Sequence, residues 1–176
     1  YPNNPTGNAF EIEDIESVLE IASGVVVIDE AYAPFTNYTW LSRLGEYPNL
    51  LVMRTVSKLG LAGLRLGLLV GAPNWLEQID KTRLPYNINV LTQLSATFAL
   101  QHYEVLEAQT QQIKADRADL LKHLNDLKGV TAWPSEANFI LFRVKDAVAM
   151  FQGLQEREIL IKNLHGSHPL LENCLR

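Results

Sequence analysis

The stretch Val25-Val26-Val27-Ile28-Asp29-Glu30 places four β-branched residues directly before two carboxylates. A continuous β-branched run is typical of a strand that is buried on both faces of a parallel sheet. Two similar runs follow at residues 50–53 and 66–70, and apolar residues at helical spacing over 12–22 precede the first run. This alternation predicts an α/β fold, in which ligand sites lie beyond the carboxyl ends of the strands.

Downstream of these strands the sequence predicts further helices and a second, smaller unit. The pattern favours helices over residues 74–83, 91–127 and 147–156, and strands over residues 139–142 and 159–162. A helix as long as 91–127 often crosses between domains, and Gly129 ends it. We therefore expect a first domain over residues 1–105, and a linking helix with a smaller α+β domain over residues 106–176.

The composition excludes several classes of protein. Of the 176 residues, 47% are hydrophobic and 20% are charged, which rules out wholesale disorder. The net charge of −5 and the lack of a Lys/Arg run argue against nucleic acid or an anionic membrane as the main partner. The single Cys174 excludes an internal disulfide and a cysteine-based zinc site. No apolar run approaches the roughly 20 residues of a membrane span, so we expect a soluble, cytoplasmic protein.

Both ends of the chain predict that it is part of a longer protein. It begins at Tyr1 without a methionine, inside the turn-rich run of residues 2–7. It ends at Cys174-Leu175-Arg176, which has the pattern of a strand rather than of the polar, frayed tail that domains usually have. We therefore expect an internal piece.

Lys58 is the first candidate for chemistry, because it follows a buried strand and has small or apolar neighbours. Burial disfavours the ammonium form of a lysine, and the free amine can form a Schiff base. The alternative is a solvated loop lysine. Asp29, at a strand end, needs a cation partner, unless it caps a helix or forms a structural ion pair. Glu30 faces the opposite way and is the more structural carboxylate. Tyr32 could approach a ligand of Asp29 or pack in the core.

A second group of polar residues suits a phosphate. Ser57, Lys58 and Arg65 bring a hydroxyl, an ammonium and a guanidinium to one glycine-containing segment, which could hold a phosphate dianion. Asn4 lies in a turn rich in Pro and Gly, where an amide most often stabilises the turn itself. No metal site is expected, because the four histidines have no ligand-like spacing: His102, His123, His165 and His168.

Four separated motifs, taken together, resemble the fold type I pyridoxal-phosphate enzymes, specifically the class I and II aminotransferases. In chain order they are Asn4-Pro5-Thr6-Gly7, Asp29-Glu30-Ala31-Tyr32, Ser57-Lys58 and Gly63-Leu64-Arg65-Leu66-Gly67. The closer resemblance is to the histidinol-phosphate aminotransferases, and it spans the whole chain. It rests on Arg54-Thr55-Val56-Ser57-Lys58 with Leu61-Ala62-Gly63-Leu64-Arg65, on Ala137-Asn138-Phe139, and on Ile159-Leu160-Ile161-Lys162 with Asn173-Cys174-Leu175-Arg176.

The resemblance implies an aspartate-aminotransferase-like fold, with a mostly parallel sheet and flanking helices. Residues 1–105 would be the later half of the large cofactor-binding domain, and residues 106–176 would include part of the small C-terminal domain. The family's N-terminal half stacks an aromatic ring on the cofactor and forms much of the dimer interface. That half would be absent, so we expect this piece alone to be inactive.

The resemblance also implies roles toward pyridoxal 5′-phosphate. Lys58 would bind the cofactor as a Schiff base. Asp29 would pair with the protonated pyridine nitrogen, which keeps the ring an electron sink. Asn4 and Tyr32 would hydrogen-bond to the 3-oxygen of the ring.

The remaining candidates would bind phosphate groups and the substrate. Ser57 and Arg65 would bind the cofactor phosphate, and Arg176 the substrate α-carboxylate. Histidinol phosphate lacks that carboxylate, so its phosphate would bind Arg176 or another cation, and Lys162 is the nearest candidate in the sequence. The implied reaction converts histidinol phosphate and 2-oxoglutarate into imidazole acetol phosphate and glutamate in histidine biosynthesis, and the implied assembly is a homodimer. Three alternatives stay open: a threonine-phosphate decarboxylase, an aminotransferase for aromatic or other amino acids, and a non-catalytic, aminotransferase-like domain of a transcription regulator.

Overall fold

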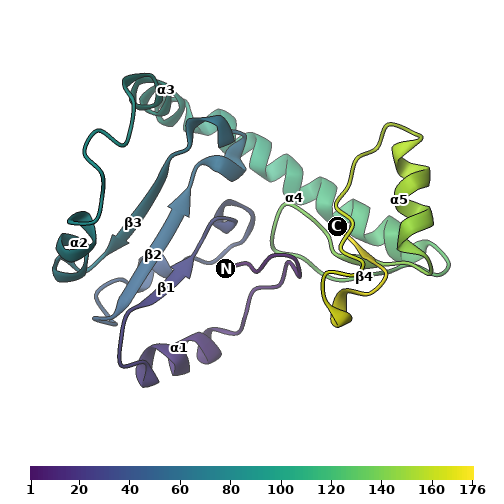
Figure 1. Ribbon diagram of the computed structural model, residues 1–176, viewed down its shortest axis with the longest axis horizontal. Helices are drawn as coiled ribbons and strands as arrows, with labels where there is room; N and C mark the ends of the chain where they lie inside the picture. Colours follow the sequence, from purple (N-terminus) through teal and green to yellow (C-terminus); the bar gives the residue numbers. More distant parts are fainter. The chain divides into compact units, whose positions relative to one another are not determined.

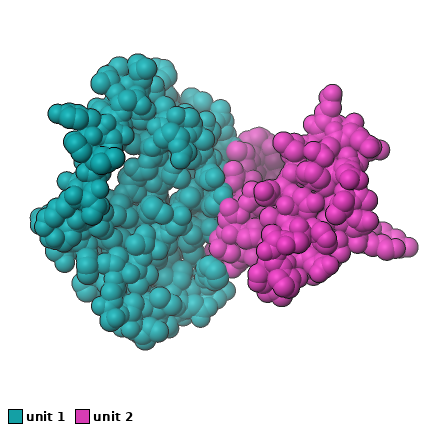
Figure 2. Space-filling model, viewed as in Figure 1, with its two compact units in different colours: residues 1–2, 10–111 teal, residues 3–9, 112–176 magenta.

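The computed structural model describes all of residues 1–176, which form two compact units (Figures 1 and 2). Unit 1 contains residues 1–2 and 10–111, and unit 2 contains residues 3–9 and 112–176. The turn at residues 3–9 therefore belongs with the C-terminal part of the chain, although the elements of unit 1 follow it in the sequence. The assignment of residues 1–105 and 106–176 to a large and a small domain of a longer protein stays a prediction.

Unit 1 is built on a three-stranded sheet in the order β1-β2-β3. The strands are β1 (Val26–Asp29), β2 (Leu50–Thr55) and β3 (Gly67–Gly71), close to the expected positions. β1 and β2 are parallel, with Asp29 opposite Met53, whereas β2 and β3 are antiparallel. The connection from β2 to β3 contains only two short 3₁₀ turns, η3 (Ser57–Leu59) and η4 (Ala62–Leu64). A parallel return needs a crossover of a dozen or more residues, so this short connection makes β3 antiparallel.

Helix α1 covers one face of this sheet (Figure 1). The remaining elements of unit 1 are α1 (Ile12–Ile21), the 3₁₀ turns η1 (Ala33–Phe35) and η2 (Trp40–Arg43), α2 (Pro73–Asp80) and α3 (Val90–Gln101). Leu19 of α1 packs with Ile28, Val52 and the fully buried Trp40 in one hydrophobic core. On the opposite face, Val27 is 50% exposed. The β-branched run of β1 is thus covered on one face, whereas the sequence pattern predicts burial on both.

The long helix expected over residues 91–127 is two helices. α3 ends at Gln101, and α4 (Tyr103–Asp126) begins after His102, whose φ of −115° and ψ of 37° are not helical. Neither Gly nor Pro marks this break, and the sequence pattern continues through it, so periodicity alone does not predict it. None of the helices has both the length and the apolar character that a membrane span requires.

Unit 2 contains a second sheet, made of short antiparallel strands in the order β4-β5-β6. The elements are β4 (Thr131–Ala132), β5 (Phe142–Arg143), α5 (Ala147–Gln155), the 3₁₀ turn η5 (Pro169–Leu171) and β6 (Cys174–Leu175). The strand pattern at the end of the chain is confirmed by β6. Residues 159–162 do not form the expected strand, although Lys162 and Arg176 are joined by two backbone hydrogen bonds. Asp146 caps α5 by accepting a hydrogen bond of 2.9 Å from the backbone N–H of Ala149.

Candidate active site

The two carboxylates at the end of β1 lie in different surroundings. Asp29 is exposed, and its Oδ1 accepts a hydrogen bond of 2.9 Å from the backbone N–H of Ala31. Glu30 is only 1% exposed and contacts Trp40 in the core. Adjacent residues of a strand face opposite ways, so Asp29 is the carboxylate that a ligand can reach.

The Glu30 side chain is fully hydrogen-bonded. Its Oε1 accepts from the backbone N–H of Trp40 at 2.5 Å, and its Oε2 accepts from Thr39 Oγ1 at 2.9 Å. Arg54 Nε donates to the same Oε2 at 2.9 Å, and Arg54 Nη2 lies 2.8 Å from it in an ion pair. The prediction that Glu30 is the structural member of the carboxylate pair is confirmed.

Tyr32 and Lys58 face each other near the ends of β1 and β2. The Tyr32 ring is buried, and the Lys58 Nζ lies 5.1 Å from the centroid of that ring. A cation within about 6 Å of an aromatic face is attracted by the ring quadrupole. Lys58 is half-buried in η3. The Lys58 side chain is therefore not freely solvated, and the roles of Lys58 and Tyr32 toward a ligand stay predictions.

Thr55, the last residue of β2, anchors the segment that carries Ser57. Its Oγ1 is hydrogen-bonded to Ser57 Oγ at 2.8 Å and to the Leu66 carbonyl oxygen at 3.0 Å, and it accepts from the Ser57 N–H at 3.1 Å. Arg65 follows η4 with a φ of 50°, in the left-handed region that residues other than glycine rarely adopt. Such strain persists only where the surrounding structure imposes it, and it clusters at functional sites.

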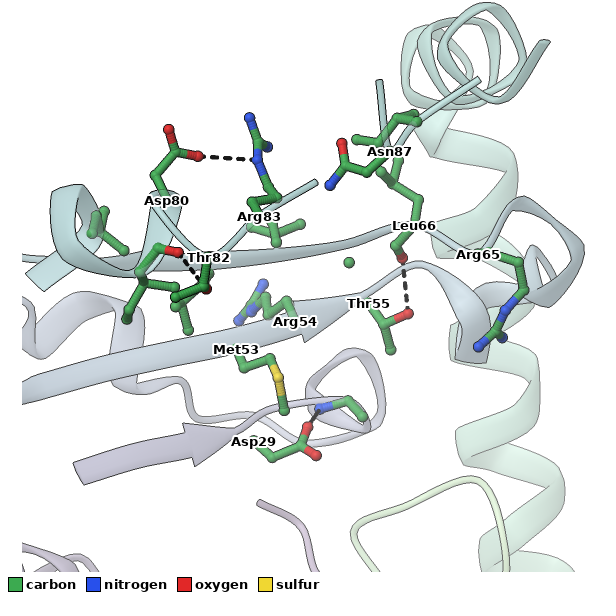
Figure 3. A pocket seen from close by; sticks show the side chains of 17 residues that line it. Asp29, Met53, Arg54, Thr55, Arg65, Leu66, Asp80, Thr82, Arg83 and Asn87 are labelled. Atoms are coloured by element: carbon green, nitrogen blue, oxygen red, sulfur yellow. Dashed lines mark hydrogen bonds and ion pairs between the residues drawn. The ribbon is translucent and has the colours of Figure 1, made fainter. Parts of the chain in front are cut away.

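A cavity of about 870 Å³ opens beside the sheet of unit 1 (Figure 3). Cavities of about 300–1,000 Å³ commonly bind small molecules. Asp29 and Arg65 both line it, and Asp80 and Arg83 form an ion pair of 3.0 Å on its α2 side. Lys58 is not among the lining residues. One cavity is therefore lined by both the candidate carboxylate, Asp29, and the candidate phosphate ligand, Arg65, but not by Lys58.

Three candidate residues, Asn4, Lys162 and Arg176, belong to unit 2. Arg176 Nη1 donates a hydrogen bond to Asn4 Oδ1, and its Cζ lies 4.8 Å from the centroid of the Phe139 ring. Lys162 is exposed and exchanges two backbone hydrogen bonds with Arg176. The fold thus brings together the turn that carries Asn4 and the last residue of the chain.

The turn at residues 3–9 is held in unit 2 through Gly7. The φ of Gly7 is +76°, and a Cβ there would lie 2.5 Å from Ser135 Oγ, so no side chain fits. The Gly7 carbonyl oxygen accepts from the backbone N–H of Glu136 at 2.7 Å. Nearby, Arg117 Nη1 donates to the Ala137 carbonyl oxygen at 2.7 Å. Burial lowers the pKa of the Arg117 guanidinium, and the negative charge of Glu136 opposes that shift.

Two histidine side chains of the C-terminal loop accept hydrogen bonds from backbone N–H groups. His165 Nδ1 accepts from the N–H of Asn173, and His168 Nδ1 accepts from the N–H of Leu170, both at 3.1 Å. No group of three His, Cys, Asp or Glu side chains is placed to hold a metal ion. These contacts give the two histidines a structural role in shaping the loop before β6.

The sequence model of one family, described as aminotransferase class I and II, matches residues 1–176. The chain belongs to this family. Among curated relatives, the histidinol-phosphate aminotransferase 2 of Cupriavidus pinatubonensis is 54% identical to this chain, over 100% of the chain and 50% of the relative. The chain therefore spans about half the length of the curated relatives that it matches.

Solved structures of two relatives confirm the expected aspartate-aminotransferase-like α/β fold of this chain. The L-threonine-O-3-phosphate decarboxylase from Porphyromonas gingivalis is 26% identical with a TM-score of 0.85, over 99% of this chain and 56% of that one. The histidinol-phosphate aminotransferase from Sinorhizobium meliloti, in complex with pyridoxal-5′-phosphate, is 26% identical with a TM-score of 0.86, over 99% and 50%.

Sequence reasoning missed the side chains that support the candidate site of this chain. The alternation of Leu50, Val52 and Arg54 in β2 was a usable signal, because it puts a guanidinium in register with two core positions. A charge at such a position requires a buried partner, which is Glu30. Phe139 belongs to a motif of the sequence, but its contact with the last residue of the chain has no local signal.

Proposed function

We propose that the complete protein containing this chain is a histidinol-phosphate aminotransferase that uses pyridoxal 5′-phosphate. It transfers the amino group of histidinol phosphate to 2-oxoglutarate, which yields imidazole acetol phosphate and glutamate in histidine biosynthesis. Family membership supports the transferase class, and curated relatives of that name, between 50% and 54% identical over the whole chain, support the substrate. The proposal includes a cytoplasmic homodimer, which the resemblance to the family implies.

The side chains of unit 1 have the chemistry to hold a phosphorylated pyridine aldehyde. An amine, a carboxylate and a phenol come from Lys58, Asp29 and Tyr32, and a hydroxyl and a guanidinium come from Ser57 and Arg65. The observation that carries the proposal is the 5.1 Å approach of the Lys58 Nζ to the buried Tyr32 ring, three residues beyond Asp29. The solved relative from Sinorhizobium meliloti supports the identity of the cofactor.

Each residue of this group has a separate task. When bound, pyridoxal phosphate supplies an electron sink for the electron pair left at the substrate carbon that loses a proton. Lys58 binds the aldehyde group through its amine and takes and returns the proton at that carbon. Asp29 holds a proton on the pyridine nitrogen, because its negative charge favours the protonated ring. Tyr32 donates or accepts a hydrogen bond at the 3-oxygen, and the resemblance to the family implies the same role for Asn4.

Phosphate and carboxylate groups are bound by the remaining candidates. Ser57 and Arg65 bind the cofactor phosphate, and the hydrogen bonds of Thr55 hold Ser57 in place for this task. Arg176 binds the α-carboxylate of glutamate, since a planar guanidinium matches a carboxylate with two parallel hydrogen bonds. Histidinol phosphate has no carboxylate, and its phosphate binds Lys162, the exposed cation that is paired with Arg176 through the backbone.

The test of the proposal is chemical labelling of Lys58 in the complete protein. Borohydride reduction of the protein with its cofactor should attach the cofactor to Lys58 and to no other lysine, as mapped by peptide mass spectrometry. Lys58→Ala should abolish both the adduct and transamination of histidinol phosphate with 2-oxoglutarate. An adduct on Lys81 or Lys162, or full transamination by Lys58→Ala, contradicts the proposal.

A threonine-phosphate decarboxylase is the second candidate, because the solved decarboxylase from Porphyromonas gingivalis has the same fold at 26% identity. Both candidate substrates carry a phosphate ester, so Lys162 suits either. The products separate the two functions. Release of CO₂ from threonine phosphate without consumption of a keto acid supports the decarboxylase, whereas glutamate formed from 2-oxoglutarate and histidinol phosphate supports the aminotransferase.

A further inference from the structure

The buried network around Glu30 connects three segments of unit 1. Glu30 directly follows β1, Thr39 precedes η2, and Arg54 is the penultimate residue of β2. Arg54 Nη2 donates to Thr39 Oγ1 at 2.8 Å, in addition to its contacts with Glu30. Thr39 Oγ1 also accepts from the backbone N–H of Leu41 at 3.0 Å. Both carboxylate oxygens of Glu30 and the hydroxyl of Thr39 therefore have hydrogen-bond partners.

Stability alone does not explain a network of this kind. A carboxylate with no exposed surface must be desolvated, and its attraction to a guanidinium often only offsets that cost. Apolar side chains of similar volume are frequently as stabilising. A satisfied buried network instead specifies one geometry, because every alternative arrangement leaves a buried charge without a partner. We therefore ask which parts of unit 1 the Glu30 network holds in a fixed geometry.

That geometry involves both segments that carry the proposed cofactor ligands. The backbone carbonyl of Glu30 accepts from the N–H of Ala33 at 3.1 Å, which closes the turn that contains Tyr32. Its backbone N–H donates to the Met53 carbonyl oxygen at 2.7 Å, which fixes the end of β1 against β2. Arg54 is followed at once by Thr55, which holds Ser57. One ion pair thus spans the turn after Asp29 and the strand that leads to Lys58.

We propose that Glu30 and Arg54 are positioning residues for the cofactor. Their ion pair, with Thr39, sets the separation between the Asp29–Tyr32 turn and the Ser57–Lys58 turn, so that carboxylate, phenol and amine meet one pyridine ring. Glu30 itself has no exposed side-chain surface and cannot touch the cofactor. The inference rests on the proposed function, because it concerns the binding of pyridoxal 5′-phosphate.

The experiment compares two variants of the network with a matched control in the complete protein. Glu30→Gln keeps the shape of the side chain, but replaces one accepting oxygen by an NH₂ group. That group can only donate, and it would face the donors that surround Glu30. Arg54→Lys keeps the charge, but loses the fork that reaches both Glu30 and Thr39. Glu16→Gln is the control, because it removes an ion pair of 2.7 Å with Arg43 and changes none of the hydrogen bonds among Glu30, Thr39 and Arg54.

Two measurements separate positioning from a merely structural role. The dissociation constant of pyridoxal 5′-phosphate is measured by titration of the apo-protein, and the pH midpoint of the visible absorption of the bound cofactor is measured by spectrophotometry. Thermal unfolding of the apo-protein is followed in parallel. We expect both network variants to bind pyridoxal 5′-phosphate about tenfold more weakly, and to shift the pH midpoint by about half a unit or more. Glu16→Gln should leave both values unchanged, whatever its effect on thermal unfolding.

The outcomes distinguish this inference from the proposed function. If the wild-type protein does not take up pyridoxal 5′-phosphate, the proposed function is wrong, and the inference falls with it. If the wild type binds the cofactor, but both variants lose only thermal stability and keep the affinity and the pH midpoint, the network is structural and the inference alone is overturned. Should Glu30→Gln fail to fold, the milder Arg54→Lys decides by the same two values.

Discussion

Lys162 and Arg176 exchange both of their backbone hydrogen bonds, with N···O distances of 3.0 and 2.9 Å. Residues paired in this way across antiparallel strands present their side chains on the same face. Arg176 is further held by Asn4 and by the ring of Phe139, whereas the Lys162 side chain is exposed. The side chains of two cations of unit 2 therefore lie side by side. That of Arg176 is held by its contacts, and that of Lys162 is exposed to solvent.

This pairing predicts different losses for the two substrates of the proposed reaction. Lys162→Ala should raise the KM for histidinol phosphate about tenfold, roughly 1.4 kcal/mol, and leave the KM for glutamate nearly unchanged. Arg176→Ala should impair both substrates, because it also removes the partner of Asn4. Steady-state kinetics with each substrate measure the difference. Equal losses for both substrates in Lys162→Ala would exclude Lys162 from phosphate binding.

Arg176→Lys should not be a conservative replacement. Lysine keeps the charge, but it lacks the planar fork that binds a carboxylate through two hydrogen bonds and stacks on an aromatic ring. We expect a rise in the KM for glutamate of at least about tenfold, close to the effect of Arg176→Ala. Wild-type kinetics for Arg176→Lys would show that charge alone is sufficient at this position.

Asp29→Asn tests the carboxylate that remains exposed at the end of β1. Loss of its charge should slow proton abstraction from the substrate by roughly 100-fold or more, a barrier increase of about 3 kcal/mol. The rate of exchange of the substrate α-proton with solvent measures this step directly. Asp14→Asn, on the exposed side of α1, serves as the control and should exchange at the wild-type rate. Near-normal exchange in Asp29→Asn would mean that the carboxylate only shapes the turn.

Arg65→Gly should separate backbone strain from phosphate binding. Glycine adopts the φ of 50° without penalty, so this variant should raise the free energy of unfolding of the apo-protein by up to about 1 kcal/mol. It should nevertheless bind pyridoxal 5′-phosphate more weakly, because the guanidinium is lost. Arg65→Ala should lose the same affinity without the gain in stability. Denaturant unfolding and cofactor titration of both variants are the measurements, and an unchanged cofactor affinity in both would remove Arg65 from the phosphate site.

Gly7→Ala should destabilise unit 2 through a steric contact with Ser135. The added Cβ would lie 2.5 Å from Ser135 Oγ, and the φ of +76° is unfavourable for alanine. We expect a loss of about 1–3 kcal/mol in the free energy of unfolding. Gly129→Ala is the matched control, because Gly129 has a φ of +81° but nothing within 4 Å of the added Cβ. Equal losses in the two variants would show that the contact with Ser135 contributes nothing.

Most strand positions of unit 1 could be predicted from the sequence, because continuous apolar runs bounded by glycine and polar residues are local signals. The same alternation of faces correctly separated Asp29 from Glu30. The direction of β3, in contrast, was not predicted, although its cause, the short connection of residues 56–66, is visible in the sequence. The break at His102 is marked by neither Gly nor Pro. The expected strand over residues 159–162 is reduced to the backbone pairing of its last residue.

The sequence by itself determined the family of this chain and named the candidate side chains for its chemistry, because motifs such as Asp29–Tyr32 and Ser57–Lys58 are contiguous and their spacing is local. Only the tertiary structure decided which supporting residues hold them. Glu30 forms an ion pair with Arg54 on the neighbouring parallel strand, and Asn4 is hydrogen-bonded to Arg176, 172 positions away in the chain. Contacts of this range depend on how elements pack, and a buried charge or a close backbone approach becomes visible only when its distant partner is in place.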